Sequence, residues 1–321
     1  MKTEPEGFSL GSILACVSEG TFSDHAIHAA ADLANQFGAR LELIHAVQEP
    51  NLLTTRFDSS QVAAMEAEQV GRARKTLVAH LAHSQHGREV NGSPLEELLH
   101  VTAGPPAKRV LDRAREVSAD LIVIGDSGKR RQLDFGGTAR VILGKSECPV
   151  LLQTTPPHAI ERILVPVDMS SHSMKALSSA IDLARTLGAT VTALNCFTVR
   201  EYSYGGLPYG VGYAGIPALD SVRDGAREHF EETMAKVDWK GVEHETLFAE
   251  EDPAAGVLAR QDGYDLIVMG THGRTGLAAT LLGGVAYYVL RSSHTPVLAI
   301  RSPKTAWLLE SAAVAKGDPT R

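Results

Sequence analysis

Glycines follow an apolar run in the second half of the chain at a spacing that suits a phosphate group. Residues 265–269 (DLIVM) indicate a buried strand, Gly270 and Gly273 come directly after it, and Gly283 and Gly284 lie ten residues further on. Glycines let backbone N–H groups approach a phosphate closely, and a following helix N-terminus adds a partial positive charge. On spacing alone, a phosphate cradle and a plain turn of the chain are equally good interpretations.

Asp168 ends a second apolar run, residues 163–167 (ILVPV). Ligands of doubly wound sheets bind outside the carboxyl ends of the strands, so we expect Asp168 and Gly270 at the same edge of a sheet. A carboxylate there can accept a hydrogen bond from a sugar hydroxyl or a base N–H. The alternative is that Asp168 caps the following helix and Gly270 and Gly273 only turn the chain.

The first half of the chain contains a near copy of this pattern. Residues 120–124 (DLIVI) precede Gly125, Gly128, Gly137 and Thr138. Four blocks correspond at shifts of 145 to 150 positions: 13–17 with 163–167, 37–41 with 187–191, 120–125 with 265–270, and 148–150 with 295–297. Such a nearly constant shift indicates one domain that was duplicated and fused.

Apolar runs alternate with helical patterns in both halves. In the first half we expect strands at 12–17, 40–46, 97–101, 120–124 and 149–153, and helices at 23–37, 61–83, 106–117 and 137–144. In the second we expect strands at 162–167, 190–197, 244–248, 265–269 and 296–300, and helices at 173–187, 219–236, 253–261 and 283–291. Continuously apolar strands are typical of a parallel sheet buried on both faces, and alternation with helices implies right-handed crossovers. The predicted fold class is α/β, with two tandem Rossmann-like domains, each a doubly wound five-stranded parallel sheet.

The chain length of 321 residues suits two domains of about 150 residues each. We place domain one at 8–154 and domain two at 160–302, with a linker at 153–159 that Pro156 and Pro157 keep out of helix or strand. Residues 303–321 form a C-terminal tail, either a short extra helix or disordered.

Composition excludes several classes of function. The chain is 44% apolar and 21% charged with a net charge of −7, which argues against a nucleic-acid binder. Lys129, Arg130 and Arg131 indicate a solvated loop.

No signal-peptide pattern and no apolar stretch of about 18 residues occurs, so we expect a cytoplasmic protein without membrane contact. Cys16, Cys148 and Cys196 lie in strand-like apolar runs and are expected to be small buried hydrophobes in a reducing compartment.

Motifs for catalysis or for metal binding are weak. His80, His83 and His86 share a spacing of three residues, but no Cys or carboxylate joins them, so a solvated helix face is favoured and no structural metal is expected. The chain has no Walker motif, no nucleophile elbow and no His-Glu-x-x-His. No nucleophile stands at a recognisable distance from a base. We therefore expect no catalytic residues.

The stretch GTHGRTGL that begins at Gly270, the LGGVA that begins at Leu282 and the TPVL that begins at Thr295 closely resemble the universal stress protein family. Nucleotide-binding members of that family carry Gly-x2-Gly-x9-Gly-(Ser/Thr), with an Asp that ends the first strand in a context like 165–168 (VPVD). The resemblance covers nearly the whole chain, twice. It implies that the chain is a stress-response protein with an adenine nucleotide alpha hydrolase-like fold. It also implies that the chain binds ATP or AMP, with or without Mg²⁺, and hydrolyses ATP weakly at most.

The resemblance also implies a role for each matching residue of domain two. Asp168 would contact the adenine or ribose end of the nucleotide. The phosphates would lie against residues of the glycine pattern: Gly270, His272, Gly273, Arg274, Gly283, Gly284 and Val285. Gly284 stands where the family has a hydroxyl, and a hydrogen bond to a charged ligand is worth about 1.5–3 kcal/mol. The affinity is therefore expected to fall without vanishing.

Domain one departs from the family pattern in a different way. It keeps Gly125, Gly128, Gly137 and Thr138, but only eight residues separate Gly128 from Gly137, and Ser18 replaces the acid. We expect a degenerate partner domain that is a weaker candidate for nucleotide binding.

The family's single domains often pair through their last strands. We therefore expect residues 150–153 and 297–300 to pair within this chain as a pseudo-dimer, which covers two exposed sheet edges. Homodimerisation and unidentified protein partners are left open. The rival hypothesis is a nucleotide-free interaction or apolar-ligand module of the same fold. The Tyr- and Gly-rich segment 202–213 is a candidate lid, a docking surface or a plain crossover loop.

Overall fold

The computed structural model describes residues 10–48, 59–84, 88–125, 137–198, 219–271 and 282–301. The larger elements of domain one are β1 (Ser12–Cys16), α1 (Asp24–Phe37), β2 (Arg40–Val47), α2 (Ser59–Ser84), β5 (Leu99–Ala103), α3 (Pro106–Glu116), β6 (Leu121–Gly125), α4 (Gly137–Lys145) and β7 (Val150–Gln153). Those of domain two are β8 (Arg162–Pro166), α5 (Ser171–Leu187), β9 (Thr190–Cys196), α7 (Leu219–Ala235), β10 (His244–Ala249), α8 (Pro253–Arg260), β11 (Leu266–Gly270), α9 (Gly284–Ser292) and β12 (Val297–Ile300).

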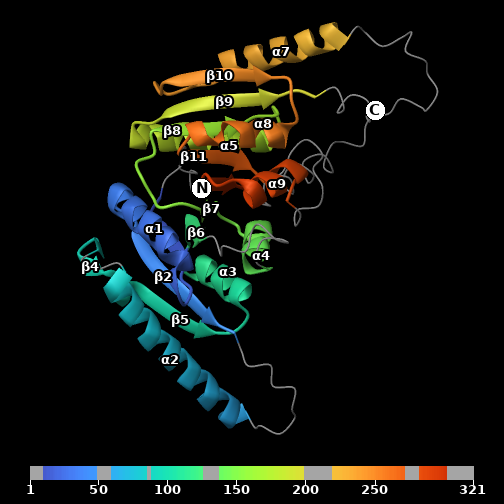
Figure 1. Cartoon of the computed structure of the whole chain (residues 1–321). Helices are drawn as coiled ribbons and strands as arrows, with labels where there is room; N and C mark the ends of the chain where they lie inside the picture. Colours follow the sequence, from blue (N-terminus) through green and yellow to red (C-terminus); the bar gives the residue numbers. More distant parts are fainter. Residues whose placement is uncertain are drawn as a thin grey trace, which may run out of the picture.

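One ten-stranded sheet runs through both domains (Figure 1). Its strand order is β10-β9-β8-β11-β12-β7-β6-β1-β2-β5. Within this sheet of described strands, neighbours are parallel in each half, and β12 and β7 alone meet antiparallel, with Val297 opposite Leu152 and Leu298 opposite Leu151. The predicted pair of doubly wound, five-stranded parallel sheets and their pairing through the last strands are confirmed. We call the β7–β12 contact the seam.

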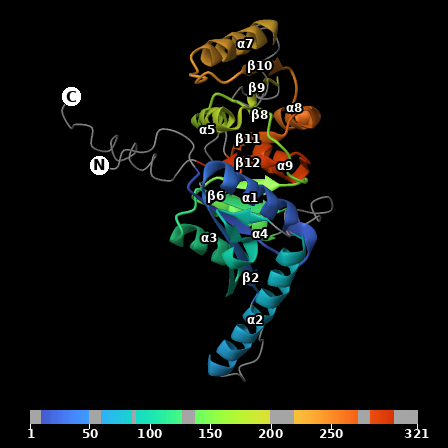
Figure 2. The same ribbon diagram turned by 90° about the vertical axis from the view of Figure 1, so that its left-hand side faces the viewer.

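Helices cover both faces of the sheet because alternate strand residues are apolar on opposite sides. Ile13 and Ala15 of β1 belong to a core under α1, α2, α5 and α7, whereas Leu14 belongs to a core under α3, α4, α8 and α9. Figure 2 shows α5 and α8 on opposite sides of the sheet in domain two. The first core reaches across the seam on the α1 and α5 side, since Leu151 and Leu298 both belong to it.

Two features of domain one differ from the sequence prediction. The strand expected at 97–101 begins later, at Leu99, because residues Leu95–Leu98 form a 3-10 turn first. A small hairpin, β3 (Glu89–Val90) and β4 (Ser93–Pro94), was not predicted. Asn91 and Gly92 form its turn with φ of 52° and 81°. Paired positive φ values are what an Asn-Gly hairpin turn requires, so this dipeptide was the missed signal.

The cysteines are free and partly buried. Cys16 and Cys196 end strands, as predicted, but Cys148 lies in the turn before β7, where its backbone N–H donates to Ser146 Oγ at 3.2 Å. Burial raises the pKa of the Cys16 thiol, and of the Cys196 thiol, to about 12. Thiolates are the reactive form of cysteine, so these two thiols are poor nucleophiles near neutral pH. In the described part of the chain, no helix is long and apolar enough to cross a membrane.

Candidate functional site

Domain two brings Asp168 and Gly270 to one edge of the sheet. Asp168 follows β8 and Gly270 ends β11, and these two strands are neighbours. The chain leaves β8 for β9 on its other side, so the order of the strands reverses between β8 and β11. Such a switch point forms a crevice at the carboxyl ends of parallel strands, which is the usual ligand position in this kind of sheet.

The Asp168 carboxylate is fixed by the loop that follows it. Its Oδ1 accepts hydrogen bonds from the Ser170 backbone N–H at 3.0 Å and from Ser170 Oγ at 2.5 Å. The Asp168 N–H donates to Ser173 Oγ at 3.2 Å, and Met169 takes a positive φ of 60°. Ser170, not Asp168, caps α5, because its Oγ accepts the Ser173 N–H. The carboxylate is therefore held at the sheet edge without serving as the helix cap.

The two ends of the glycine pattern lie side by side. The Gly283 N–H donates to the Thr271 carbonyl oxygen at 2.8 Å, which joins the start of α9 to the end of β11. Gly270 packs so closely on the start of α5 that a Cβ there would lie 3.0 Å from the His172 carbonyl oxygen. The packing of α5 against β11 therefore requires a glycine at position 270, whether or not a phosphate binds nearby.

The N-terminus of α9 retains its positive dipole end. Gly283 is the N-cap and offers no side-chain acceptor, and the first turn contains no acidic residue. Gly284 and Val285 are exposed, and a Cβ at Gly284 would meet nothing within 4 Å. Uncapped N–H groups at a helix start attract an anion, so this end of the pattern can serve as half of a phosphate site.

Several predicted site residues lie outside the described residues. They are His272, Gly273, Arg274 and Gly128, together with the Lys129–Arg131 cluster, the 202–213 segment and the 303–321 tail. Their predicted roles remain predictions.

Asn195 at the end of β9 also supports the site and was not predicted. Its Nδ2 donates to the Val167 carbonyl oxygen at 2.7 Å, and the side chain is buried. His45 of domain one makes the equivalent contact, from Nδ1 to the Val17 carbonyl oxygen at 2.8 Å. The shift of 150 positions relates both pairs, so the internal repeat was the signal that could have found them.

Domain one lacks the acidic half of this arrangement. The Ser18 N–H donates to Ser23 Oγ at 3.0 Å, as the Asp168 N–H does to Ser173 Oγ. No carboxylate stands at position 18, and Gly20, with φ of 100°, occupies the position of Ser170. The first copy therefore keeps this backbone hydrogen bond but lacks both the acid and the Ser170 hydroxyl of the second copy.

The helix register corrects how the two copies correspond. Ser146 N–H donates to the Ile142 carbonyl and Ser293 N–H to the Val289 carbonyl, both at 2.8 Å, which is a shift of 147 positions. α4 and α9 begin at Gly137 and Gly284, which differ by the same shift. Thr138 thus corresponds to Val285, whereas the sequence comparison had paired it with Gly284. The shift of 147 also relates 148–150 to 295–297, whereas the shift before the loop, between 120–125 and 265–270, is 145, so the loop of domain one is two residues shorter.

Of the histidine series, His80 and His83 lie on α2, and His86 lies outside the described residues. Within the described residues, no group of His, Cys, Asp and Glu side chains could hold a metal ion. His80 Nε2 contacts Asp24 Oδ1 at 2.7 Å, and both side chains are about four-fifths buried, with 20% and 19% of their surface exposed. The predicted solvated face is therefore wrong for His80, which tethers α2 to α1. His83 is exposed.

The fold and this edge define a tandem α/β protein of the kind that places ligands at a strand-order switch point. The family model described as "Universal stress protein family" matches residues 10–153 and again 159–301. The chain belongs to the universal stress protein family, as its sequence resemblance predicted.

Individual relatives agree with this assignment. A universal stress protein of Mycolicibacterium smegmatis is 25% identical over 309 residues, 90% of this chain and 96% of that protein. One from Methanocaldococcus jannaschii is 34% identical over 154 residues, 45% of this chain and 84% of that protein. The crystal structure of a universal stress protein from Archaeoglobus fulgidus covers 90% of this chain and 98% of its own, at 17% identity and a TM-score of 0.61, which shows the shared fold.

Proposed function

We propose that this chain is a stress-response signalling protein that binds an adenine nucleotide, ATP or AMP, at the β8–β11 edge of domain two. One observation carries the proposal: a fixed carboxylate and an uncapped helix N-terminus lie on the same edge, at the switch point. A nucleotide has hydroxyl and N–H donors at one end and anionic phosphates at the other. Asp168 suits the first end and the start of α9 suits the second.

The remaining residues take supporting roles in this proposal. The phosphates lie against Gly283, Gly284 and Val285, and the family pattern makes His272, Gly273 and Arg274 further candidates for phosphate contact. Mg²⁺, where it accompanies ATP, is held through the phosphates. Domain one acts as a degenerate partner that completes the sheet, since Ser18 and Gly20 supply no acid and no hydroxyl equivalent to Ser170.

Asp168→Ala tests the proposal. We expect nucleotide affinity to fall about 10- to 100-fold, because a charge-assisted hydrogen bond is worth about 1.5–3 kcal/mol. Isothermal titration with ATP, ADP and AMP measures the loss. Ser18→Ala, at the equivalent position of domain one, is the matched control and should bind as the parent chain does.

Two outcomes of this titration would redirect the proposal. Binding that survives Asp168→Ala but is lost on Thr138→Ala would move the site to domain one. No heat and no thermal shift at millimolar nucleotide would favour the rival module, which binds partners or apolar ligands without nucleotide. If the chain released phosphate from ATP faster than a Gly273→Val control does, it would also hydrolyse ATP weakly. No catalytic residue is proposed for that reaction.

Gly284→Ser should strengthen binding. It restores the hydroxyl of the family pattern at a position where a side chain meets nothing within 4 Å. One added hydrogen bond to a phosphate is worth about 1.5 kcal/mol or more, so we expect roughly tenfold tighter ATP binding by titration. Gly284→Ala adds the Cβ without the hydroxyl and should leave affinity near the parent value. Equal affinities for the two variants would place the phosphates elsewhere.

A further inference from the structure

A cavity of about 910 Å³ lies between the two domains, on the side of the seam that faces α1 and α5. Leu151 and Leu298, which pair across the seam, line it together with residues of both helices. On the other face of the sheet, α4 and α9 belong to the same core as the seam residues Val150 and Val297. A cavity of this size is in the range that holds a small organic ligand.

The apolar wall of the cavity follows the internal repeat. Leu10 and Ile160, Leu33 and Leu183, Leu121 and Leu266 occupy equivalent positions of the two domains and all line it. The cavity therefore lies on the pseudo-twofold axis that relates the two domains, and both domains are needed to form it. Burial of a ligand's apolar surface here gains about 25 cal/mol per Å².

The cavity is distinct from the proposed nucleotide site. Arg162 begins β8, Asp265 precedes β11, and both line the cavity. Asp168 and Gly270 lie at the opposite ends of the same strands, about 16 Å away at about 3.3 Å per residue. A ligand in the cavity would leave the switch-point crevice open.

Gln153 supplies a buried polar group in the cavity wall. The residue is 5% exposed and lines the cavity, and its Nε2 donates to the Thr155 carbonyl oxygen at 2.9 Å. Its Oε1 has no hydrogen-bond partner among the described residues. A buried amide oxygen without a partner costs free energy, and a ligand that donates a hydrogen bond to it would recover that cost.

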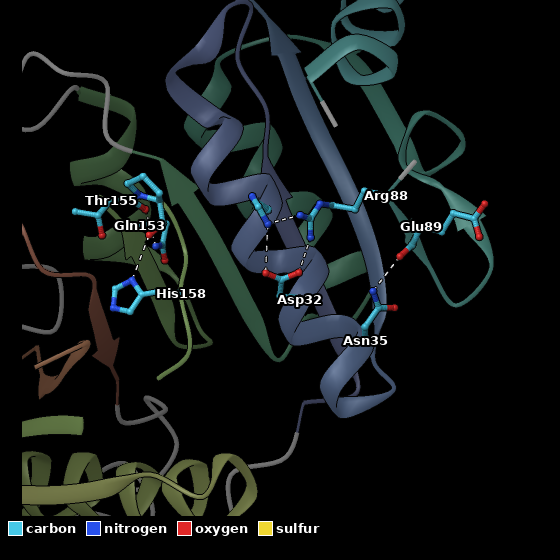
Figure 3. A network of polar contacts seen from close by, with 9 residues as sticks. Asp32, Asn35, Arg88, Glu89, Gln153, Thr155 and His158 are labelled. Atoms are coloured by element: carbon cyan, nitrogen blue, oxygen red, sulfur yellow. Dashed lines mark hydrogen bonds and ion pairs between the residues drawn. The ribbon is translucent and has the colours of Figure 1, made fainter. Parts of the chain in front are cut away.

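The charges around the cavity are mainly negative. Four carboxylates line it, those of Asp32, Glu161, Glu243 and Asp265, against one guanidinium, that of Arg162. Asp32 is paired with Arg88 (Figure 3). Asp265 accepts from His158 Nε2 at 2.9 Å and from the backbone N–H groups of Glu161 and Arg162. Glu161 and Glu243 form no ion pair with any described residue, so they are available to a cation.

We propose that this interdomain cavity binds an amphiphilic cation, a molecule with an apolar body and an ammonium group. The leucine wall takes the apolar body. The ammonium N–H groups donate to Gln153 Oε1 at the seam, and the carboxylates around the cavity give it the negative potential that attracts a cation. Fatty acids and nucleotides of similar size are disfavoured, because their negative charge would meet the same carboxylates.

Two probes of equal chain length and opposite charge test this proposal. Dodecylammonium and dodecanoate, each below its micelle concentration, are titrated into the full chain by calorimetry. We expect one dodecylammonium per chain, bound at least tenfold more tightly than dodecanoate. Equal or tighter binding of dodecanoate, or no binding of either probe, would overturn the proposal.

Matched variants locate the binding. Ala29 lines the cavity from α1, so Ala29→Phe should fill it and abolish dodecylammonium binding, whereas Ala82→Phe on the exposed part of α2 should not. The double variant Glu161→Gln/Glu243→Gln lowers the negative potential of the cavity and should weaken dodecylammonium binding about two- to threefold, since these exposed charges act at a distance. Glu228→Gln/Glu231→Gln on α7 should leave it unchanged. All four glutamates are exposed, so these variants keep the fold. Unchanged affinity in the Ala29→Phe chain would place the probe elsewhere.

The nucleotide and the cation proposals can fail separately. ATP titration of the Ala29→Phe chain should match the parent, because Asp168 and the start of α9 lie at the other end of the strands. Loss of both ligands in that variant would instead indicate a disrupted seam, and its circular dichroism and urea midpoint would show this.

Discussion

Leu152→Asp is expected to destabilise the whole chain by at least 4 kcal/mol and to lower its urea midpoint sharply. Leu152 lies in β7 opposite Val297 of β12, and the two residues are 1% and 0% exposed. An aspartate there would place an unpaired charge in an apolar core shared by both domains, which costs several kcal/mol beyond the lost apolar contact. Domains of this kind are stable by only about 5–15 kcal/mol, so the change removes much of the total.

The control for this prediction uses the open end of the sheet. Thr246→Asp, at an exposed position of edge strand β10, should shift stability by about 0.5 kcal/mol or less. A double-mutant cycle of Leu152→Ala and Val297→Ala should give a coupling of about 0.5–3 kcal/mol, since the two residues are opposite each other. A cost below about 1 kcal/mol for Leu152→Asp, or no coupling, would contradict a buried seam.

Gly270→Val is expected to lose nucleotide binding and about 3 kcal/mol of stability together. An added Cβ lies 3.0 Å from the His172 carbonyl oxygen and 3.1 Å from its carbon, which are backbone atoms that cannot rotate away. The start of α5 must therefore shift, and the loop that holds Asp168 through Ser170 shifts with it. Overpacking of this kind costs about 1–3 kcal/mol. Chemical unfolding and ATP titration of the same sample measure both losses.

Alanine substitutions at the two ends of the glycine pattern should change the stability of the chain in opposite directions. Gly284→Ala adds a Cβ into open space at the start of α9 and should stabilise the chain by about 0.4–1 kcal/mol, because it restricts the unfolded chain. Gly270→Ala should destabilise it. If both alanine variants changed stability in the same direction, the close packing of Gly270 on α5 would be refuted.

The repeat explains how much of this fold could be predicted. A strand of about five continuously apolar residues must be buried on both faces, which predicts a parallel sheet covered by helices. Because the same pattern occurs twice, the strand and helix boundaries expected in one half could be checked against those in the other. The family resemblance predicts the pairing of 150–153 with 297–300, and the antiparallel contact of β7 with β12 confirms it. The strand at Leu99 was misplaced since its start depends on a preceding 3-10 turn that has no periodicity of its own.

Sequence alone determined the class of the protein and the position of Asp168 at a strand end, because both depend on local periodicity and on chain order. Only the tertiary structure decided which groups meet there. Ser170 holds the carboxylate, Asn195 arrives from another strand, and Gly137 rather than Thr138 matches Gly284. The interdomain cavity likewise has no linear pattern, since its wall combines residues from both copies that become neighbours only when the seam forms.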